Sequence, residues 1–403
     1  MRPAALAFNP VSSTLVLLGA FALAWLPLMR SAPNRMLSGQ AVTVWEVLQT
    51  SPSAIWASFL LVLVLNLMGC VLRSSQLILW LRASLACMLI VLLLALAGGY
   101  AQHVALTQSP IARTSLGAAY WCLVVLAWLL AADCMQRLRA RLLPRAALTA
   151  VTLLLITLML TTGWCDQLSI MKEYFNRADI FGAAIWRHIQ IVLLTMLPTL
   201  LIGIPMGWWV HQQRSANGKV FAVLNIIQTI PSIALFGLLM TPLALLATNF
   251  PTLAQMGISG VGLAPGVIAL VLYSLLPVVR GTLAGLDQVP SAVVNAARGM
   301  GMSPAQLAWR VKLPLSLPVL LSGVRSATIA AVGMATVTGL IGAGGLGAIM
   351  FEGLFSSAQD LVLLGVAPIV ALALITDALF KLLIQFTLRA SHTVQPAHQG
   401  ALA

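Results

Sequence analysis

Long apolar runs separated by short polar segments make up most of this chain. The runs are about 20 residues long, which is the length an α-helix needs to cross the hydrocarbon core of a bilayer. They lack the period-two alternation of a membrane barrel strand. The pattern therefore predicts an all-α polytopic membrane protein with about ten transmembrane helices. We place the spans at residues 11–29, 54–72, 83–100, 115–132, 146–165, 189–210, 220–246, 262–279, 319–341 and 361–380.

The composition agrees with this pattern. Hydrophobic residues make up 60% of the 403 residues, charged residues make up 8%, and the mean hydropathy is +1.00. A soluble globular protein has about a quarter of its residues charged. The composition therefore excludes a soluble protein of this length.

The basic residues orient the chain. With the N-terminus in the cytoplasm and the spans alternating, fifteen Lys and Arg lie inside and six lie outside. This asymmetry predicts that both termini are cytoplasmic. Because topology accounts for the net charge of +13, no nucleic-acid partner is needed to explain it. The inner residues are Arg2, Arg73, Arg82, Arg137, Arg139, Arg141, Arg145, Arg214, Lys219, Arg280, Arg298, Arg310, Lys312, Lys381 and Arg389, and the outer ones are Arg30, Arg35, Arg113, Lys172, Arg177 and Arg187.

The chain divides into two halves of different character. Residues 1–165 form a Leu- and Ala-rich extension of five spans, and residues 166–188 form an outer linker in which we expect a short interfacial helix. Residues 189–389 form the second half, which includes a cytoplasmic loop at 281–318, and residues 390–403 form a cytoplasmic tail.

Pro and Gly interrupt three consecutive spans of the second half, at "MLPTLLIGIPMG" (196–207), "IQTIPSIALFG" (227–237) and "GLAPG" (262–266). Broken helices at membrane depth are tolerated where the freed backbone groups are buried in protein or line a cavity. We therefore expect a pathway through this half, with Gln228, Pro231 and Ser232 as candidate pathway residues. Kinked packing is the alternative explanation for each proline.

The loop at 281–318 contains the polar stretch "VVNAARGMGMSPAQLAWRVKLPLSLP" (293–318). Pro290 suits the first position of a helix, which Gly299 and Gly301 end. Ser303-Pro304-Ala305-Gln306 has the form of a capping box for a second helix, which we expect to end at Leu313-Pro314. Leu307 and Val311 share one face of that helix. From the residues alone, the loop either docks a partner or folds back onto its own spans.

The same loop resembles the EAA loop of ABC-importer permease subunits, which docks on a separate ATPase. The residues that carry the likeness at the family spacing are Asn295-Ala296-Ala297, Gly301, Val311 and Leu313-Pro314, with the cap Ser303-Pro304 between them. Asn295 stands where the family has Glu, so an ion pair from that position to the ATPase is lost. The resemblance implies that the loop couples this chain to the ATPase.

Three stretches are similar to permeases of quaternary-amine osmoprotectant importers, which take up glycine betaine, choline, carnitine or proline betaine: "NIIQTIPSIALFGLL" (225–239), "ARGMGMSPAQLAWRVKLPLSLPV" (297–319) and "GLIGAGGLGAIMFEGL" (339–354). The likeness covers about residues 182–389, and the first five spans resemble a long form of this family. It implies a permease core of five to six helices in a bacterial inner membrane. The implied partners are two ATP-binding subunits, an outer solute-binding protein, and a second copy or a sister permease.

Motifs for chemistry within the chain itself are missing from the sequence. "GAGGLG" (342–347) matches a dinucleotide motif in spelling but follows a membrane span, so we interpret Gly342, Gly344 and Gly345 as a packing turn or an outer gate. No G-x-x-x-x-G-K-[ST] motif is present. We therefore expect no enzyme activity, no metal and no cofactor in this chain, with ATP and Mg²⁺ bound by the partner.

Arg325 lies about six residues into its span, roughly 9 Å deep. It either snorkels to the inner interface or serves in gating or in bracing the loop.

Two other functions compete with the osmoprotectant permease. An EAA loop does not encode the cargo, so a permease for methionine or an alkylsulfonate is one alternative. A secondary transporter or channel is the other, although the outer two-thirds of every predicted span lacks the Asp and Glu that ion coupling uses.

Overall fold

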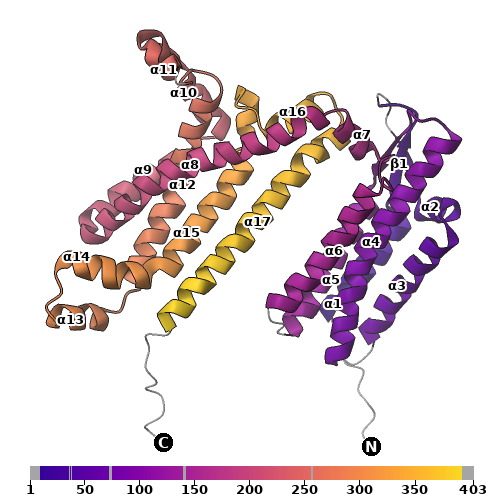
Figure 1. The fold of residues 1–403 in the computed structure, drawn as a ribbon, viewed down its shortest axis with the longest axis horizontal. Coiled ribbons are helices and arrows are strands. Elements are labelled where there is room, and N and C mark those ends of the chain that lie inside the picture. The colour runs from indigo at the N-terminus through magenta and orange to yellow at the C-terminus, as the bar shows by residue number, and fades with distance from the viewer. Residues whose placement is uncertain are drawn as a thin grey trace, which may run out of the picture. The chain divides into compact units, whose positions relative to one another are not determined.

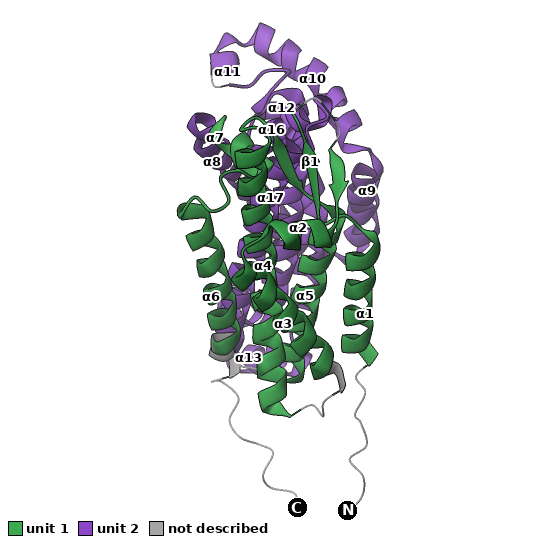
Figure 2. Cartoon of the chain, turned by 90° about the vertical axis from the view of Figure 1, so that its right-hand side faces the viewer, with its two compact units in different colours: residues 1–176 green, residues 177–403 purple. Residues whose placement is uncertain are grey.

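The computed structural model describes residues 10–35, 37, 39–71, 75–138, 142–255 and 257–392. The chain forms two compact units, residues 1–176 and 177–403 (Figure 2). The predicted tail beyond His392 lies outside the described residues, as do Arg2, Arg73, Arg139 and Arg141.

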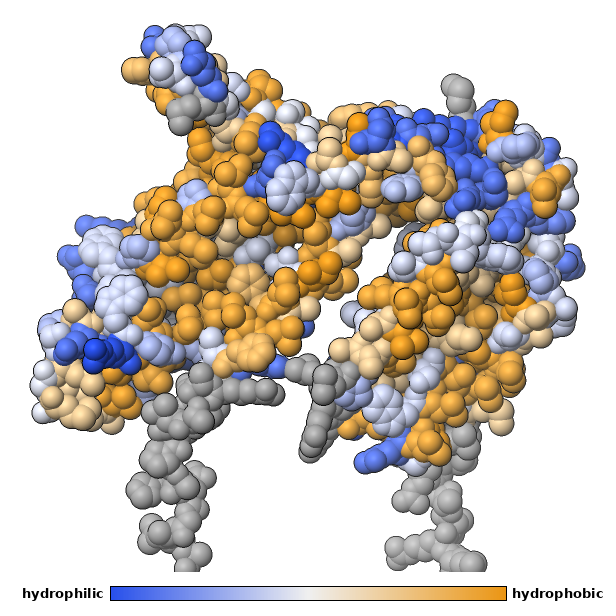
Figure 3. All heavy atoms as spheres, in the orientation of Figure 1, coloured by the Kyte–Doolittle hydropathy of each residue, from blue (hydrophilic) through white to orange (hydrophobic). Residues whose placement is uncertain are grey.

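Eight helices of the described residues are long and apolar enough to cross a membrane. They correspond to eight of the ten predicted spans and confirm a polytopic helical protein. The spans predicted at 11–29 and 54–72 correspond to shorter apolar helices, the first of which has 16 residues and is about 24 Å long at 1.5 Å per residue. In each unit, apolar side chains cover the lengths of the helices and polar side chains gather near their ends (Figure 3).

The first unit is a helical bundle with a small sheet at one end (Figure 1). Helix α4 packs against α3, α5 and α6, and α1 packs against α5. Its fully buried core includes Phe59, Leu93, Leu96 and Leu168. The elements are α1 (Pro10–Trp25), β1 (Met29–Ala32), β2 (Gln40–Val42), α2 (Val44–Thr50), α3 (Ser53–Val71), α4 (Gln76–Thr107), β3 (Arg113–Leu116), α5 (Ala118–Arg137), α6 (Leu142–Thr161) and α7 (Ser169–Phe175).

The sequence did not predict the sheet. Its strands are antiparallel in the order β2-β1-β3, with Met29 opposite both Val42 and Leu116. They are only three to four residues long, so they carry too little alternation to be recognised in the sequence.

The predicted outer linker contains a short helix, α7. Side chains of α7 bind residues in and beside the sheet. Glu173 of α7 is 1% exposed and pairs with Arg35 at 3.2 Å and Arg113 at 3.4 Å. Lys172 donates to the carbonyls of Pro110 and Ala112, each at 2.9 Å. Burial, helped by Arg113, lowers the pKa of Lys172.

The second unit is built around α12, which packs against α8, α9, α10 and α15. Helix α15 also packs against α17, which covers α16. The elements are α8 (Ala178–Gln212), η1 (Arg214–Ala216), α9 (Asn217–Thr229), α10 (Ser232–Asn249), α11 (Pro251–Gln255), α12 (Leu263–Asp287), α13 (Ser291–Gly299), α14 (Pro304–Leu307), η2 (Ala308–Lys312), α15 (Leu313–Met334), η3 (Val337–Ile341), α16 (Leu346–Phe355) and α17 (Gln359–His392).

Small residues allow α12 to approach both α8 and α15 closely. A Cβ atom placed on Gly207 of α8 would lie 2.6 Å from the Cβ of Thr282 on α12. One placed on Gly281 of α12 would lie 2.6 Å from the Cα of Gly323 on α15. Van der Waals packing of this kind holds membrane helices together, because lipid is as apolar as their side chains. The three helices therefore form the tightest layer of this unit.

Two of the predicted spans have wrong boundaries. The span predicted at 220–246 is two helices, α9 and α10, separated at Pro231. The span predicted at 319–341 already ends at Met334, where a short 3-10 turn follows. In contrast, α8 runs unbroken through Pro198 and Pro205, and Pro265 lies in the first turns of α12. Of the three predicted interruptions, one breaks its span. The neighbouring packing supports the other prolines within helices.

Arg325 of α15 pairs with Asp377 of α17 and does not snorkel as a lone cation. Its Nε donates to Asp377 Oδ1 at 2.6 Å, and Lys381 Nζ lies 2.6 Å from Asp377 Oδ2. The carboxylate thus neutralises a cation within a membrane span, where an unpaired charge is costly. This cluster joins α15 to α17.

Gly323→Ala is expected to destabilise the protein by about 1–3 kcal/mol, because the added methyl group would lie 2.7 Å from Gly281 Cα and would force α12 and α15 apart. The matched control is Gly333→Ala in the same helix, where no atom lies within 4 Å of the new Cβ. Thermal unfolding of the full chain in detergent measures both. Equal unfolding temperatures would contradict the close-packing account.

Asp377→Asn is expected to destabilise the protein by about 2 kcal/mol, because Arg325 would lose its charge-assisted hydrogen bond inside the membrane. Lys381→Met removes the other cation, whose side chain is 57% exposed, and is expected to cost about 0–1 kcal/mol. Chemical unfolding of the two variants in the same detergent compares them. A larger loss for Lys381→Met would show that Arg325 is not the main partner.

Candidate functional site

The loop that the charge asymmetry places in the cytoplasm begins with α13, which ends near Gly299 and Gly301 as predicted. Pro290 is its N-cap residue, one position earlier than expected. At the other end Gly301 has φ +79°, a left-handed conformation that favours glycine. The Met302 amide donates to the Ala297 carbonyl at 3.2 Å and the Gly301 amide donates to the Arg298 carbonyl at 2.9 Å. These bonds form a Schellman motif, which turns the chain towards the next helix.

The second helix of the loop starts with the predicted capping box. The Gln306 amide donates to Ser303 Oγ at 3.3 Å, and the Ser303 amide donates to Gln306 Oε1 at 2.9 Å. Pro304 follows at the first helical position. Gly301, Ser303 and Pro304 therefore shape the loop itself.

The prediction that this helix ends at Leu313-Pro314 is wrong. Residues 308–312 form a π-helical turn, η2, in which the Leu313 amide donates to the Ala308 carbonyl, and α15 continues directly from it. The proline has no N–H, and its ring would clash with the carbonyl four residues earlier in an ordinary α-helix. The wider π turn relieves that conflict. The loop is thus joined to the span α15 by one continuous helical run (Figure 1).

Exposure separates the loop residues that a partner could touch from those that it could not. Asn295 and Ala296 are exposed, but Ala297 and Leu307 are 2% and 6% exposed. Val311 and Leu313 are half-buried, whereas Pro314 is exposed. Of the two alternatives that the sequence left open for the face of Leu307 and Val311, the buried Leu307 favours packing within the chain. The large exposed apolar side chains that precede α15 in the loop are Val293, Met300 and Trp309.

The break between α9 and α10 opens a cavity of about 410 Å³ that faces α12 and α15. Gln228, Pro231 and Ser232, the candidate pathway residues of the sequence, all line it. Sequence spacing did not indicate the residues that α12 and α15 contribute, because they come together only through packing. The full lining is Gln228, Thr229, Ile230, Pro231, Ser232, Tyr273, Ser274, Pro277, Ala330 and Met334.

Two side-chain hydrogen bonds tie the break to α12, and one of them satisfies the Ile230 carbonyl at the break. The Gln228 side-chain amide donates to the Tyr273 carbonyl at 3.0 Å, and the Tyr273 hydroxyl donates to the Ile230 carbonyl. The Leu235 amide donates to the Pro231 carbonyl and restarts the helix. Interrupted backbone at membrane depth requires such partners. Tyr273 thus fixes the shape of the break from the neighbouring helix.

The other four candidate pathway residues lie away from this cavity. Arg325 pairs with Asp377, as described above. Gly342, Gly344 and Gly345 have φ values of +81°, +82° and +75° in the turn between η3 and α16. Arg187 Nε of α8 donates to the Ala343 carbonyl at 3.0 Å and holds this turn. The geometry is that of a packing turn, one of the two interpretations of the sequence.

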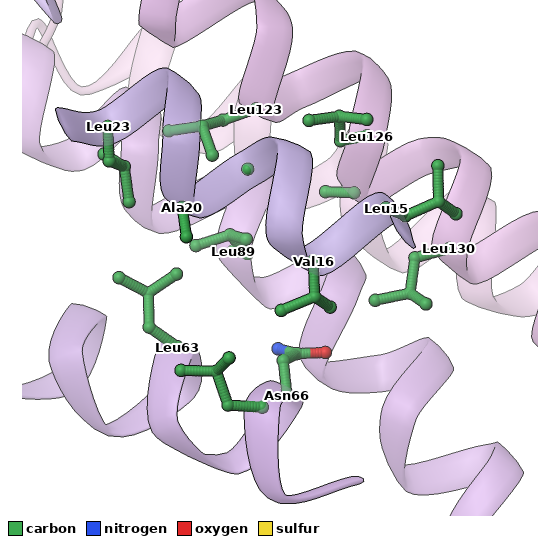
Figure 4. A pocket seen from close by; sticks show the side chains of 13 residues that line it. Leu15, Val16, Ala20, Leu23, Leu63, Asn66, Leu89, Leu123, Leu126 and Leu130 are labelled. Atoms are coloured by element: carbon green, nitrogen blue, oxygen red, sulfur yellow. The ribbon is translucent and has the colours of Figure 1, made fainter. Parts of the chain in front are cut away.

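A second cavity, in the first unit, is almost wholly apolar (Figure 4). Leucine and alanine side chains of α1, α3, α4 and α5 line it, and Asn66 is the polar residue among them. Asn66 donates to the Val62 carbonyl of its own helix at 2.8 Å. Such a lining offers little to a charged solute, so the cavity at the α9–α10 break is the better candidate for a pathway.

Two family models match the chain. Residues 9–171 match the N-terminal domain of the ABC transporter permease YehY, and residues 191–389 match the inner membrane component of binding-protein-dependent transport systems.

Curated relatives match about half of the chain. It is 35% identical to the choline transport system permease protein OpuBB of Bacillus subtilis over 48% of this chain and 81% of that protein. It is 33% identical to the osmoprotectant import permease protein OsmW of Salmonella typhimurium over 50% of this chain and 89% of that protein. It is 34% identical to the carnitine transport permease protein OpuCB of Listeria monocytogenes over 53% of this chain and 90% of that protein.

The second family model covers the α9–α10 break and the loop that continues into α15, and the relatives agree with the resemblance found in the sequence. The chain therefore belongs to the family of inner-membrane permease subunits of ABC importers, among the osmoprotectant, choline and carnitine permeases.

Proposed function

We propose that this chain is the translocating subunit of an ATP-driven importer for glycine betaine or a related quaternary-amine solute such as choline or carnitine. The observation that carries the proposal is the EAA-like loop, which runs without interruption into a helix that lines the cavity. The named substrates of the relatives support the cargo class.

The lining of the cavity is suited to weak, transient binding of such a solute during transport. Its polar groups are the hydroxyls and amides of Gln228, Thr229, Ser232, Tyr273 and Ser274, and none of its lining residues is ionised. Neutral dipoles can face either end of a zwitterion. A pathway must also bind its cargo weakly enough to release it. Tight selection is then the task of the solute-binding protein.

The cavity is not fully enclosed by this chain, and we propose that a second permease, a copy of this chain or a sister chain, completes it. Helix α10 supports this arrangement because it carries exposed apolar side chains, including Ile233, Leu238 and Leu245 at 63%, 63% and 58%. Each permease would dock one ATP-binding subunit, giving two in the assembly. ATP and Mg²⁺ would bind those subunits, and this chain would hydrolyse nothing and hold no cofactor.

The continuous helical run from α14 to α15 suggests how ATPase closure would change access to the cavity. Closure of the ATPase subunits would displace α13 and α14 together. Because α14, η2 and α15 form one run, the displacement would reach Ala330 and Met334, which line the cavity near the far end of α15. A shift of α15 against the α9–α10 break would open the cavity to one side of the membrane and close it to the other.

Uptake of labelled glycine betaine into vesicles tests the function directly. The full chain, assembled with its ATPase and its binding protein, is expected to accumulate solute only when all three components and ATP are present. Omission of ATP from the same vesicles is the control. Accumulation at the same rate without ATP would instead support a secondary transporter.

Cross-linking tests the docking surface of the loop. A cysteine at exposed Ala296 is expected to capture the ATPase subunit with a short cross-linker, whereas a cysteine at buried Ala297 is expected to capture at least about ten-fold less because the thiolate is the reactive form and needs access. Band shifts of the assembled complex on denaturing gels measure both. Equal capture from the two positions, or none from Ala296, would contradict this docking surface.

A further inference from the structure

Four polar side chains meet where the inner ends of α8 and α12 reach the loop. His211 Nδ1 of α8 lies 2.7 Å from Asp287 Oδ1 at the end of α12. Arg214 binds the same carboxylate with both Nη atoms, at 2.7 and 3.0 Å. Lys312 Nζ, at the end of the π turn η2, lies 3.1 Å from His211 Nε2. The cluster thus joins the end of α8 and η1 to Asp287, which lies 73 residues after Arg214, and to Lys312, which lies 101 residues after His211.

The chemistry of the four groups determines which atom donates each hydrogen bond. An ammonium group can only donate, so Lys312 donates to His211 Nε2. That ring nitrogen therefore carries no proton, and Nδ1 carries it and donates to Asp287. The arginine pairs with both carboxylate oxygens in the bidentate geometry that gives strong, directional hydrogen bonds. His211 is consequently a neutral bridge between a cation on the loop and an anion on α12.

The cluster lies where it can connect the loop to α8, a helix that is not continuous with the loop. The loop moves α15 through the backbone, because α14, η2 and α15 are one helical run. Helix α8 has no such continuity with the loop, since 78 residues separate its end at Gln212 from the start of α13 at Ser291. The contact of Lys312 with His211 is a direct polar link between the loop and the inner end of α8.

We propose that His211 and Lys312 are positioning residues that make α8 and α12 move with the loop, so that ATPase closure displaces α8, α12 and α15 together. This inference rests on the proposed function. Without the link, a displaced loop would act on α12 and α8 only through the packing of α15 against α12, and the cavity would change shape incompletely. ATP would then be hydrolysed with less solute moved.

The His211–Lys312 contact of this cluster differs from an ordinary surface ion pair. Arg214 is 60% exposed, and an exposed pair of this type contributes little to stability. The His211 side chain is 14% exposed, and Lys312 is partly buried. The inner pair therefore sits in the more protected part of the cluster, where a hydrogen bond to a charged group counts for more.

The test is the ratio of glycine betaine taken up to ATP hydrolysed by the full assembled complex in vesicles. His211→Asn keeps an amide that can donate to Asp287 but lacks the second ring nitrogen that accepts from Lys312. Lys312→Met keeps the length of the side chain and removes its donor. Each variant is expected to lower the ratio about ten-fold, the effect of losing one hydrogen bond to a charged group.

Three further variants make the result specific. Lys219→Met, the same substitution at an exposed lysine of α9, is expected to keep the ratio of the unmodified complex. Lys312→Arg restores a donor and is expected to recover at least half of the ratio. The double variant His211→Asn with Lys312→Met is expected to be no worse than either single variant, because both remove the same link.

An unchanged ratio in His211→Asn and Lys312→Met would overturn the inference, and so would losses in the double variant that multiply. Size-exclusion chromatography of each assembled complex separates coupling from folding. If uptake and hydrolysis fall in parallel with loss of the assembled complex, the cluster is structural and the inference is wrong. Absence of ATP-driven uptake by the unmodified complex would instead refute the proposed function, and this inference with it.

Discussion

The close packing of α12 against α8 and α15 is the constraint on which the second unit depends. Glycine at positions 207, 281 and 323 lets the backbones approach to a distance that a Cβ would prevent. In a membrane, this packing replaces the hydrophobic driving force that water supplies to soluble proteins. Because the layer is tight, the cavity forms beside it, at the break between α9 and α10. The loop protrudes from its inner end.

The loop and the cavity are connected by one helix. The π turn at residues 308–312 accommodates Pro314 without ending the helix, so the segment that we propose to dock the ATPase and the segment that lines the cavity are parts of one helical run. A flexible junction at this place would absorb a displacement. Proline, which usually ends a helix, here sits at a wider turn that keeps it continuous.

Asn295 removes a negative charge from the proposed docking surface of this chain. The Glu of the family would supply an anion there, and the loop segment 288–318 contains no Asp or Glu. Its exposed groups include the apolar Val293, Met300 and Trp309 and the basic Arg298 and Arg310. Contact with the ATPase through this loop would therefore rely on apolar burial and on cations of the permease.

The sequence by itself determined the helical membrane class, eight of the spans, the Schellman and capping-box turns of the loop, and the family. These features depend on run length, on local backbone preferences and on short motifs, which a linear pattern records. Tertiary structure alone decided that Pro231 breaks its span while Pro198 does not, that Ala297 is buried while Ala296 is exposed, and that Tyr273 completes the cavity. The cluster of His211, Asp287 and Lys312 also belongs to this second group. Each of these depends on which atoms of distant segments lie within bonding or packing distance, and no local pattern encodes that distance.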